Sequence, residues 1–307
     1  MKILFAGTPE FARESLEALI GADLRPALVL TQPDRPAGRG KQLAESPVKK
    51  FAQQHDIPVW QPATLKDSTA IAKLAAEKPD LLIVAAYGLL LPQAVLDIPR
   101  RGCVNVHASL LPRWRGASPI QAAILAGDTH TGVSLMQMEA GLDSGPVIAA
   151  ESLPIGPDET AGSLHDRLAV LGGSLLVRTL PAILQGTCKA RPQNPRDVTF
   201  AGKIRTEDAL LDWQQPAETN ARKVRAYNPE PGAWFRFADE RIKCWGAKNI
   251  EAAHQTPGTV IASGKDGIDV ACGAGALRLT EVQRAGGRRV RGAELAAQLG
   301  LSGKRLL

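Results

Sequence analysis

The stretch KILFAGTPEFARESLEALI, residues 2–20, joins an apolar run to a segment of helical periodicity through a Gly-Thr-Pro turn. Apolar runs and helical patterns keep alternating as far as residue 100, and LLIVAAYG at residues 81–88 is one of the later runs. Strands that alternate with helices at this spacing need right-handed crossovers, which produce a parallel sheet. The sequence therefore predicts an α/β fold with a Rossmann-like parallel sheet.

Two further apolar runs, Cys103–His107 and Gly132–Met138, are expected to extend this sheet. The segment from Ala161 to Leu184 has helical composition, interrupted by Gly172 and Gly173, and is expected to pack against the same domain. Together these segments predict an N-terminal domain over residues 1–186.

A basic segment follows. Residues 187–206 read TCKARPQNPRDVTFAGKIRT, with two prolines and five basic residues against one acidic residue, and they show no sustained period. This composition predicts a linker.

Residues 207–307 then hold short runs separated by turn residues: AWFRFA, RIKCW, GTVIAS, GIDVAC and ALRLTEV. Such runs predict a small OB-like β-barrel domain, although the pattern alone does not separate a barrel from a sandwich.

The net charge of +6 is unevenly distributed. Residues 203–307 carry 17 Lys and Arg against 12 Asp and Glu, whereas residues 1–202 carry 20 against 19. A basic C-terminal domain suggests a polyanionic partner. On charge alone, a merely solvated basic surface explains the same counts equally well.

The apolar start of the chain ends at Thr8, Pro9 and Glu10, which is not the pattern of a signal peptide. No later apolar run approaches the roughly 20 residues that a membrane span needs. The cysteines lie far apart and show no metal-ligand spacing; they are Cys103, Cys188, Cys244 and Cys272. We therefore expect a cytoplasmic protein without a membrane partner or a metal, and with reduced thiols.

The turn after the first strand, Gly7-Thr8-Pro9-Glu10, stands where a dinucleotide-binding protein would present GxGxxG. The second and third glycines are missing. The close approach to a pyrophosphate that those glycines allow is therefore absent, which argues against a dehydrogenase.

Asn105 and His107 lie two residues apart at the end of a predicted strand, so their side chains share one face. About 30 residues later, Asp143 stands between glycines that mark tight turns and could return it to the same place. Each residue alone is more often structural. Together they suit acyl transfer to an amine without a covalent intermediate.

In such a transfer, the Asn105 amide and a protonated His107 stabilise the oxyanion of a tetrahedral intermediate. Asp143 orients the imidazole and helps to remove a proton from the amine. A covalent mechanism through Ser109 or Cys103 is disfavoured, because neither residue lies in a nucleophile-elbow or papain-like motif.

Two segments carry a resemblance: NVHASLLPRWRGASPIQAAILAGD at residues 105–128 and GVSLMQMEAGLDSGPVI at residues 132–148. They resemble the signature region of the folate-dependent formyltransferases. The resemblance implies a catalytic trio of Asn105, His107 and Asp143. It also implies that the pocket for the cosubstrate 10-formyltetrahydrofolate is lined by Ser109, Leu110, Leu111 and Pro112.

Within this family, FAGTPEF at residues 5–11 and the loop Thr31–Lys49 resemble the branch that formylates the amino group of methionyl initiator tRNA for translation initiation. In that branch the corresponding loop enters the acceptor stem of the tRNA, and the arginine that matches Arg39 is implicated in this contact. Arg35, Arg39 and Lys41 are therefore expected to contact the tRNA. Such a loop can bind phosphates and read an unpaired end. We expect the enzyme to be a monomer.

Three other functions remain open from the residues. A sugar-nucleotide N-formyltransferase shares the trio and predicts a charge-balanced C-terminal domain. A formyltetrahydrofolate hydrolase uses water as the acceptor and does not need the basic domain. A non-catalytic nucleic-acid-binding protein would use the barrel alone, and it leaves the trio unexplained.

Overall fold

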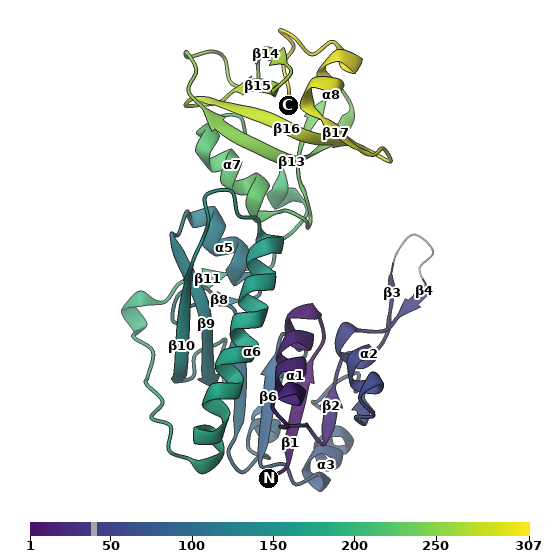
Figure 1. Ribbon diagram of the computed structural model, residues 1–307, viewed down its shortest axis with the longest axis vertical. Coiled ribbons are helices and arrows are strands. Elements are labelled where there is room, and N and C mark those ends of the chain that lie inside the picture. The colour runs from purple at the N-terminus through teal and green to yellow at the C-terminus, as the bar shows by residue number, and fades with distance from the viewer. Residues whose placement is uncertain (38–41) are drawn as a thin grey trace. The chain divides into compact units, whose positions relative to one another are not determined.

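The computed structural model describes residues 1–37 and 42–307, and the chain divides into two compact units (Figure 1). Unit 1 comprises Met1–Pro119, His130–Pro154 and His165–Ala201. Unit 2 comprises Ile120–Thr129, Ile155–Leu164 and Gly202–Leu307.

Unit 1 is built on a seven-stranded sheet in the order β10-β9-β7-β6-β1-β2-β5. Its strands are β1 (Ile3–Gly7), β2 (Leu28–Leu30), β5 (Val59–Trp60), β6 (Leu81–Ala85), β7 (Cys103–His107), β9 (His130–Gln137) and β10 (Val147–Pro154). The five strands from β7 to β5 are parallel, as predicted. Every residue of β1, β6 and β7 is buried, which is typical of strands covered on both faces.

The other two strands extend the sheet, as predicted for β9, and make it mixed. β9 runs antiparallel to β7, and β10 runs antiparallel to β9. Because β9 starts at the end of the sheet where β7 stops, the chain between them needs no crossover. Residues 138–146, which join β9 to β10, are likewise too few for a helical crossover.

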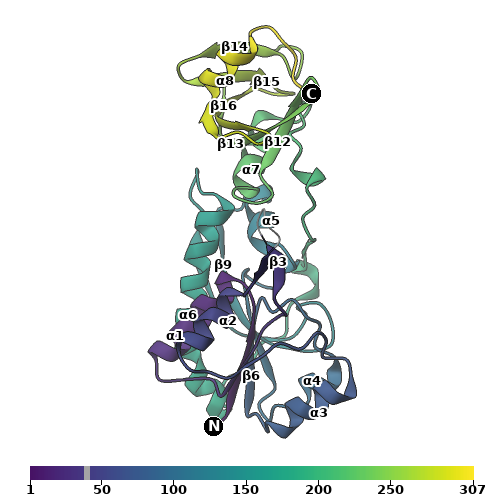
Figure 2. The ribbon, with the colours of Figure 1, turned by 90° about the vertical axis from the view of Figure 1, so that its right-hand side faces the viewer.

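Helices cover both faces of this sheet, with α1 and α6 on one side and α3 and α4 on the other (Figure 2). The helices of unit 1 are α1 (Glu10–Gly21), α2 (Pro47–Gln54), α3 (Ser68–Ala76), α4 (Gln93–Leu96) and most of α6 (Ala161–Gln185), whereas α5 (Pro119–Ala126) belongs almost wholly to unit 2. The close start of α1 requires Gly7, because a Cβ there would lie 2.5 Å from the Ala12 Cβ.

The helix α6 runs without a break through Gly172 and Gly173, where the sequence suggested an interruption. A Cβ at Gly172 would lie 3.0 Å from Val106, and one at Gly173 would lie 2.9 Å from Ala18, so the glycines allow close packing on β7 and α1. By length and composition alone α6 could cross a membrane, contrary to the expectation above. Its contacts identify it as a covering helix of the sheet.

Unit 2 contains an antiparallel sheet in the order β12-β13-β16-β15-β14, with β17 paired to β16. Its elements are α7 (Ala217–Ala226), β12 (Ala233–Phe237), β13 (Glu240–Ile250), β14 (Val260–Gly264), β15 (Gly267–Ala271), β16 (Ala276–Arg284), β17 (Arg289–Arg291) and α8 (Gly292–Leu299). All five apolar runs of the sequence form strands. The predicted small β domain is confirmed, while its two helices and β17 were not predicted.

The end of the chain links the two outer strands of this sheet. The amide of Arg236 on β12 donates to the Leu307 carbonyl at 2.7 Å, and the amide of Val260 on β14 donates to the Lys304 carbonyl at 2.9 Å. The tail thereby closes the sheet into a barrel around buried side chains such as Phe235.

Candidate active site

The strand β7 places Asn105 and His107 together at the carboxyl end of the parallel strands, the usual position of a ligand site in such sheets. Both side chains project from the same face of the strand. They are 9% and 6% exposed, respectively. Buried polar side chains at this position are available for chemistry that excludes water.

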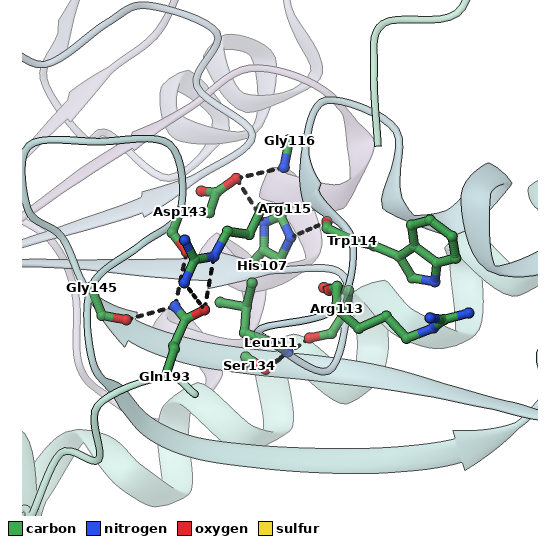
Figure 3. Close-up of polar contacts among 11 residues, drawn as sticks. His107, Leu111, Arg113, Trp114, Arg115, Gly116, Ser134, Asp143, Gly145 and Gln193 are labelled. Carbon is green, nitrogen blue, oxygen red and sulfur yellow. Dashed lines mark hydrogen bonds and ion pairs between the residues drawn. The ribbon is translucent and has the colours of Figure 1, made fainter. Parts of the chain in front are cut away.

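Both nitrogens of the His107 ring face an oxygen atom (Figure 3). Its Nε2 lies 3.1 Å from the Trp114 carbonyl oxygen, which can only accept, so Nε2 carries a proton. Its Nδ1 faces Oδ2 of Asp143 at 3.7 Å. The structure therefore brings together two of the three residues that the sequence proposed, although they are 36 positions apart in the chain.

The backbone around the site is held in unusual conformations. Asp143 has a φ of 47° and Trp114 has a φ of 61°, both in the left-handed region that few side chains adopt without support. The amide of Gly116 donates to Asp143 Oδ2 at 2.9 Å. Gly116 has a φ of 120°, and a Cβ there would lie 2.4 Å from the Ala201 carbonyl oxygen.

Gln193 also belongs to this site, and the sequence analysis did not propose it. Its Nε2 donates to the carbonyl oxygens of Asp143 and Gly145, at 2.8 and 2.7 Å. Its Oε1 accepts from Nε and Nη2 of Arg115, at 2.9 and 2.7 Å. Since Gln193 lies in the predicted linker, 50 residues from Asp143, no local pattern indicates the contact.

The predicted folate-binding segment follows His107 directly. The fully buried Ser109 donates its hydroxyl to the Arg113 carbonyl at 2.6 Å, so this group shapes the loop itself. The amide of Leu111 donates to Ser134 Oγ at 3.0 Å, which fixes the segment to β9. The side chains of Leu110, Leu111 and Pro112 remain half-buried.

The thiol nearest to the trio is not activated. Burial raises the pKa of Cys103 to about 12, and the thiol contacts the Leu96 carbonyl. Since a thiolate is the reactive form, this environment disfavours a cysteine nucleophile. Within residues 1–37 and 42–307, no group of three or more His, Cys, Asp or Glu side chains is placed to hold a metal.

The loop predicted to contact tRNA contains a two-stranded hairpin. Strands β3 (Arg35–Ala37) and β4 (Gln42–Ala44) pair antiparallel, and Arg35 is exposed. Arg39 and Lys41 lie outside the described residues. The structure therefore places one of the three predicted cations, and it supplies a regular base for the loop.

The base of this hairpin is fixed to α2 by one lysine. Lys49 Nζ lies 2.6 Å from Oδ2 of Asp34, which precedes β3, and 3.0 Å from Oε1 of Glu45, which follows β4. Gln61 donates to the other oxygen of Asp34 at 2.7 Å. The hydrogen bond from Lys49, followed by that from Gln61, lowers the pKa of the Asp34 carboxyl. The pKa of Lys49 is raised by its hydrogen bond to Asp34 and, next, by its hydrogen bond to Glu45.

Unit 2 holds several of its cations against tryptophan rings. The Arg241 guanidinium lies 4.2 Å from the ring centroid of Trp234, and the Arg289 guanidinium lies 4.0 Å from that of Trp245. Both rings are buried. Contact with the ring faces restricts the positions of these cations.

Comparisons with known proteins identify the family of this chain. The formyl transferase family model matches residues 1–180, and the formyl transferase C-terminal domain model matches residues 203–300. A methionyl-tRNA formyltransferase from Janthinobacterium sp. (strain Marseille) is 54% identical over 315 residues and 99% of each chain. The chain belongs to the methionyl-tRNA formyltransferase family. Another member, from Stenotrophomonas maltophilia (strain K279a), is 55% identical over 296 residues and 96% of each chain.

Solved structures share the fold of this formyltransferase at low identity. An N-formyltransferase from Helicobacter canadensis, in complex with folinic acid and dTDP-3-aminofucose, is 16% identical with a TM-score of 0.66, over 93% of this chain and 100% of that one. HypX from Aquifex aeolicus, in complex with tetrahydrofolic acid, is 20% identical with a TM-score of 0.64, over 99% of this chain and 48% of that one. These structures share the fold, while the family models and the close relatives confirm the predicted resemblance to the formyltransferases.

Proposed function

We propose that this enzyme transfers the formyl group of 10-formyltetrahydrofolate directly to the free amino group of methionyl initiator tRNA, through the side chains of Asn105, His107 and Asp143. The observation that carries the proposal is the buried imidazole of His107, fixed between the Trp114 carbonyl and the Asp143 carboxylate. Asn105 lies on the same face of the same strand.

Asn105 and His107 stabilise the negative charge that develops on the formyl oxygen when the amine adds to the carbonyl carbon. The Asn105 side-chain NH₂ group can donate a hydrogen bond to this oxygen, and it does not ionise. His107 is anchored through Nε2, so its Nδ1 edge faces the reacting groups, and in the protonated ring Nδ1 donates to the developing oxyanion. The 3.7 Å separation between Nδ1 and Oδ2 of Asp143 exceeds a hydrogen bond, so this nitrogen is not committed to the carboxylate and can bond to the substrate.

Asp143 orients the ring and assists removal of a proton from the attacking amine. Its Oδ2 already accepts from the Gly116 amide, so the carboxylate does not have to be ordered during the reaction. As the bond from the formyl carbon to its donor nitrogen breaks, that nitrogen takes up a proton. The attacking amine loses one proton and the donor nitrogen gains one, so the transfer balances without a covalent enzyme intermediate.

The residues after His107 fit a flat cosubstrate such as a reduced folate. The hydroxyls of Ser109 and Ser134 are used within the loop, while Leu110, Leu111 and Pro112 keep partly exposed apolar surfaces. Apolar walls with a few fixed polar groups are usual for such ligands. These residues would hold the folate ring, and the cosubstrate supplies the activated formyl group.

For the tRNA, we assign acceptor-end contacts to the loop that carries Arg35, Arg39 and Lys41, and general phosphate contacts to the basic unit 2. The excess of Lys and Arg in residues 203–307 supports the second assignment. We also propose that the enzyme works as a monomer in the cytoplasm, where initiator tRNA is charged.

One assay tests the function. The purified full-length chain is supplied with 10-formyltetrahydrofolate and with methionyl initiator tRNA, an amino sugar nucleotide, or water alone as the acceptor. We expect rapid transfer to the tRNA. Preferred transfer to the sugar nucleotide, or release of formate at the same rate without any amine, would contradict the proposal.

A further inference from the structure

The segment from Arg191 to Ala201, which the sequence assigns to a linker, is bonded into unit 1 around the active site. The amide and carbonyl of Arg191 exchange hydrogen bonds of 2.8 Å with Val147 at the start of β10. The short strand β11 (Phe200–Ala201) pairs in parallel with β8 (Arg115–Gly116). This segment therefore spans from the end of the Asp143 loop to the loop after His107.

Two side chains of the segment act on residues beside the trio. Thr199 Oγ1 accepts from the Trp114 amide at 2.9 Å, and the Trp114 carbonyl is the partner of His107 Nε2. Gln193 reaches the other loop and donates to the backbone on both sides of Ser144. Each catalytic loop is thus held by one polar side chain from the same segment.

We propose that Gln193 is a positioning residue for the formyl transfer, which holds the Asp143 loop at the distance from His107 that catalysis requires. This inference rests on the proposed roles of Asp143 and His107. Gln193 supplies two donors to the loop, while Arg115 fixes its amide from the other side through two donors of its own (Figure 3). A glutamine whose oxygen is held in this way must direct its NH₂ group toward the loop.

The left-handed φ of 47° at Asp143 explains why the loop needs this support. Such a conformation persists when the surroundings determine it. Without the two hydrogen bonds from Gln193, the Asp143 backbone gains other conformations and its carboxylate spends less time opposite the imidazole. A displacement of about 1 Å in a reacting geometry lowers a rate by up to about 10²-fold.

The first test uses Gln193→Met, which keeps the length of the side chain and removes its polar atoms. We expect kcat to fall about 10-fold to 10²-fold, with both KM values within about twofold of wild type, because the lost interaction matters in the transition state. Asn194→Leu is the matched control, since the neighbouring Asn194 bonds to Arg196 and Asp197 and not to the loop. We expect its kcat to equal that of wild type.

Gln193→Glu separates the two halves of the contact. It preserves the acceptor for Arg115 and removes both donors to the loop. If the donors position Asp143, this variant is as slow as Gln193→Met. A Gln193→Glu enzyme with wild-type kcat would overturn the proposal.

A double-mutant cycle asks whether Gln193 acts through Asp143. In an Asp143→Ala background, adding Gln193→Met should lower the single-turnover rate by less than about twofold, because the positioned carboxylate is already absent. A merely structural role would make the two losses multiply, and that result would refute the proposal.

Amide hydrogen exchange gives a readout that does not need turnover. In Gln193→Met, the amides of residues 141–145 should exchange about 10-fold faster than in wild type and in Asn194→Leu, because local opening becomes easier. Unchanged exchange there would overturn the positioning role, whatever the enzyme formylates. Failure of the wild-type enzyme to formylate initiator tRNA would instead count against the proposed function.

Discussion

Two loops of unit 1 carry the residues assigned to catalysis and to tRNA contact, and they are anchored by different means. The Asp143 loop is held along its length by the Gly116 amide and by both donors of Gln193. These partners are a backbone amide and a neutral side-chain amide, and they contact the loop at Asp143 and at Gly145. Their effect is to fix one carboxylate opposite one imidazole.

The β3–β4 hairpin is anchored at its base by charged groups. Lys49 pairs with Asp34 before β3 and with Glu45 after β4, and Thr31 Oγ1 lies 2.7 Å from Ser46 Oγ across the same base. The arms beyond this base pair with each other. Catalysis requires reacting groups that are held in place before the substrate binds. An element that contacts a nucleic acid requires only that it points toward the ligand and carries positive charge. The two anchors match these needs.

The largest effect should follow from removing a member of the trio. Replacing Asn105, His107 or Asp143 with Ala should lower kcat by about 10²-fold or more, by analogy with the loss of an oxyanion donor, while the fold survives. Pre-steady-state formylation of methionyl initiator tRNA, with circular dichroism of each variant, measures this.

Cys103→Ala is the control for these variants and should keep its rate, because the raised pKa of the buried thiol leaves it unreactive. A formylated side chain trapped during turnover would contradict direct transfer. So would a Cys103→Ala enzyme that is as slow as His107→Ala.

The trio could be proposed from the sequence because its signals are local. Asn105 and His107 share a face through strand periodicity, and Asp143 stands between glycines in a segment that resembles a known signature. Gln193 could not be proposed, because its contacts cross 48 to 78 positions of the chain and its surroundings look like a basic tether. A hydrogen bond between distant segments produces no periodic pattern in the sequence.

The same distinction holds for the fold. The strands β1, β2, β5, β6 and β7, and the strands β12 to β16 of unit 2, were predicted because each is a short apolar run between turns. The direction of β9 was not, because strand direction depends on where the chain re-enters the sheet. The tail at residues 304–307 reads KRLL and has no strand pattern, yet it closes the sheet of unit 2 through hydrogen bonds to Arg236 and Val260.

The next largest effect concerns the hairpin loop. Arg39→Ala or Arg39→Lys should lower kcat/KM for initiator tRNA by about 10-fold or more, because a planar guanidinium can stack on a base and bond a phosphate at once. Unpairing a terminal base pair costs a few kcal/mol, and less for a mismatch. If Arg39 assists this unpairing, its replacement should reduce the preference of the enzyme for tRNAs with a mismatched first pair. The KM for 10-formyltetrahydrofolate should stay unchanged.

Steady-state kinetics on tRNAs with a mismatched and with a strong first pair measure this preference. Equal preference in wild type and in Arg39→Ala would show that the loop does not read the acceptor end. The catalytic assignment would still stand in that case.

A smaller effect should follow from loosening the base of the hairpin. Lys49→Met removes the pairs with Asp34 and Glu45 and should raise the KM for tRNA roughly threefold, a size that suits partly exposed ion pairs. Lys50→Met, at the exposed neighbouring position of α2, is the matched control. Because both variants lose one positive charge, an equal rise in both would attribute the effect to net charge instead of to the anchor.

The smallest effect is a titration at the same anchor. Because Lys49, and then Gln61, lower the pKa of Asp34, the contribution of this carboxylate to stability is complete above its ordinary pKa of about 4 and is lost as the pH falls through the lowered value. Carbon-detected NMR of the carboxyl group should give a midpoint below the ordinary value in wild type. In Lys49→Met the midpoint should rise but stay below the ordinary value, since the bond from Gln61 remains. An identical midpoint in both proteins would mean that Lys49 does not hold the hairpin through Asp34 in solution, and that the two loops are anchored by similar means after all.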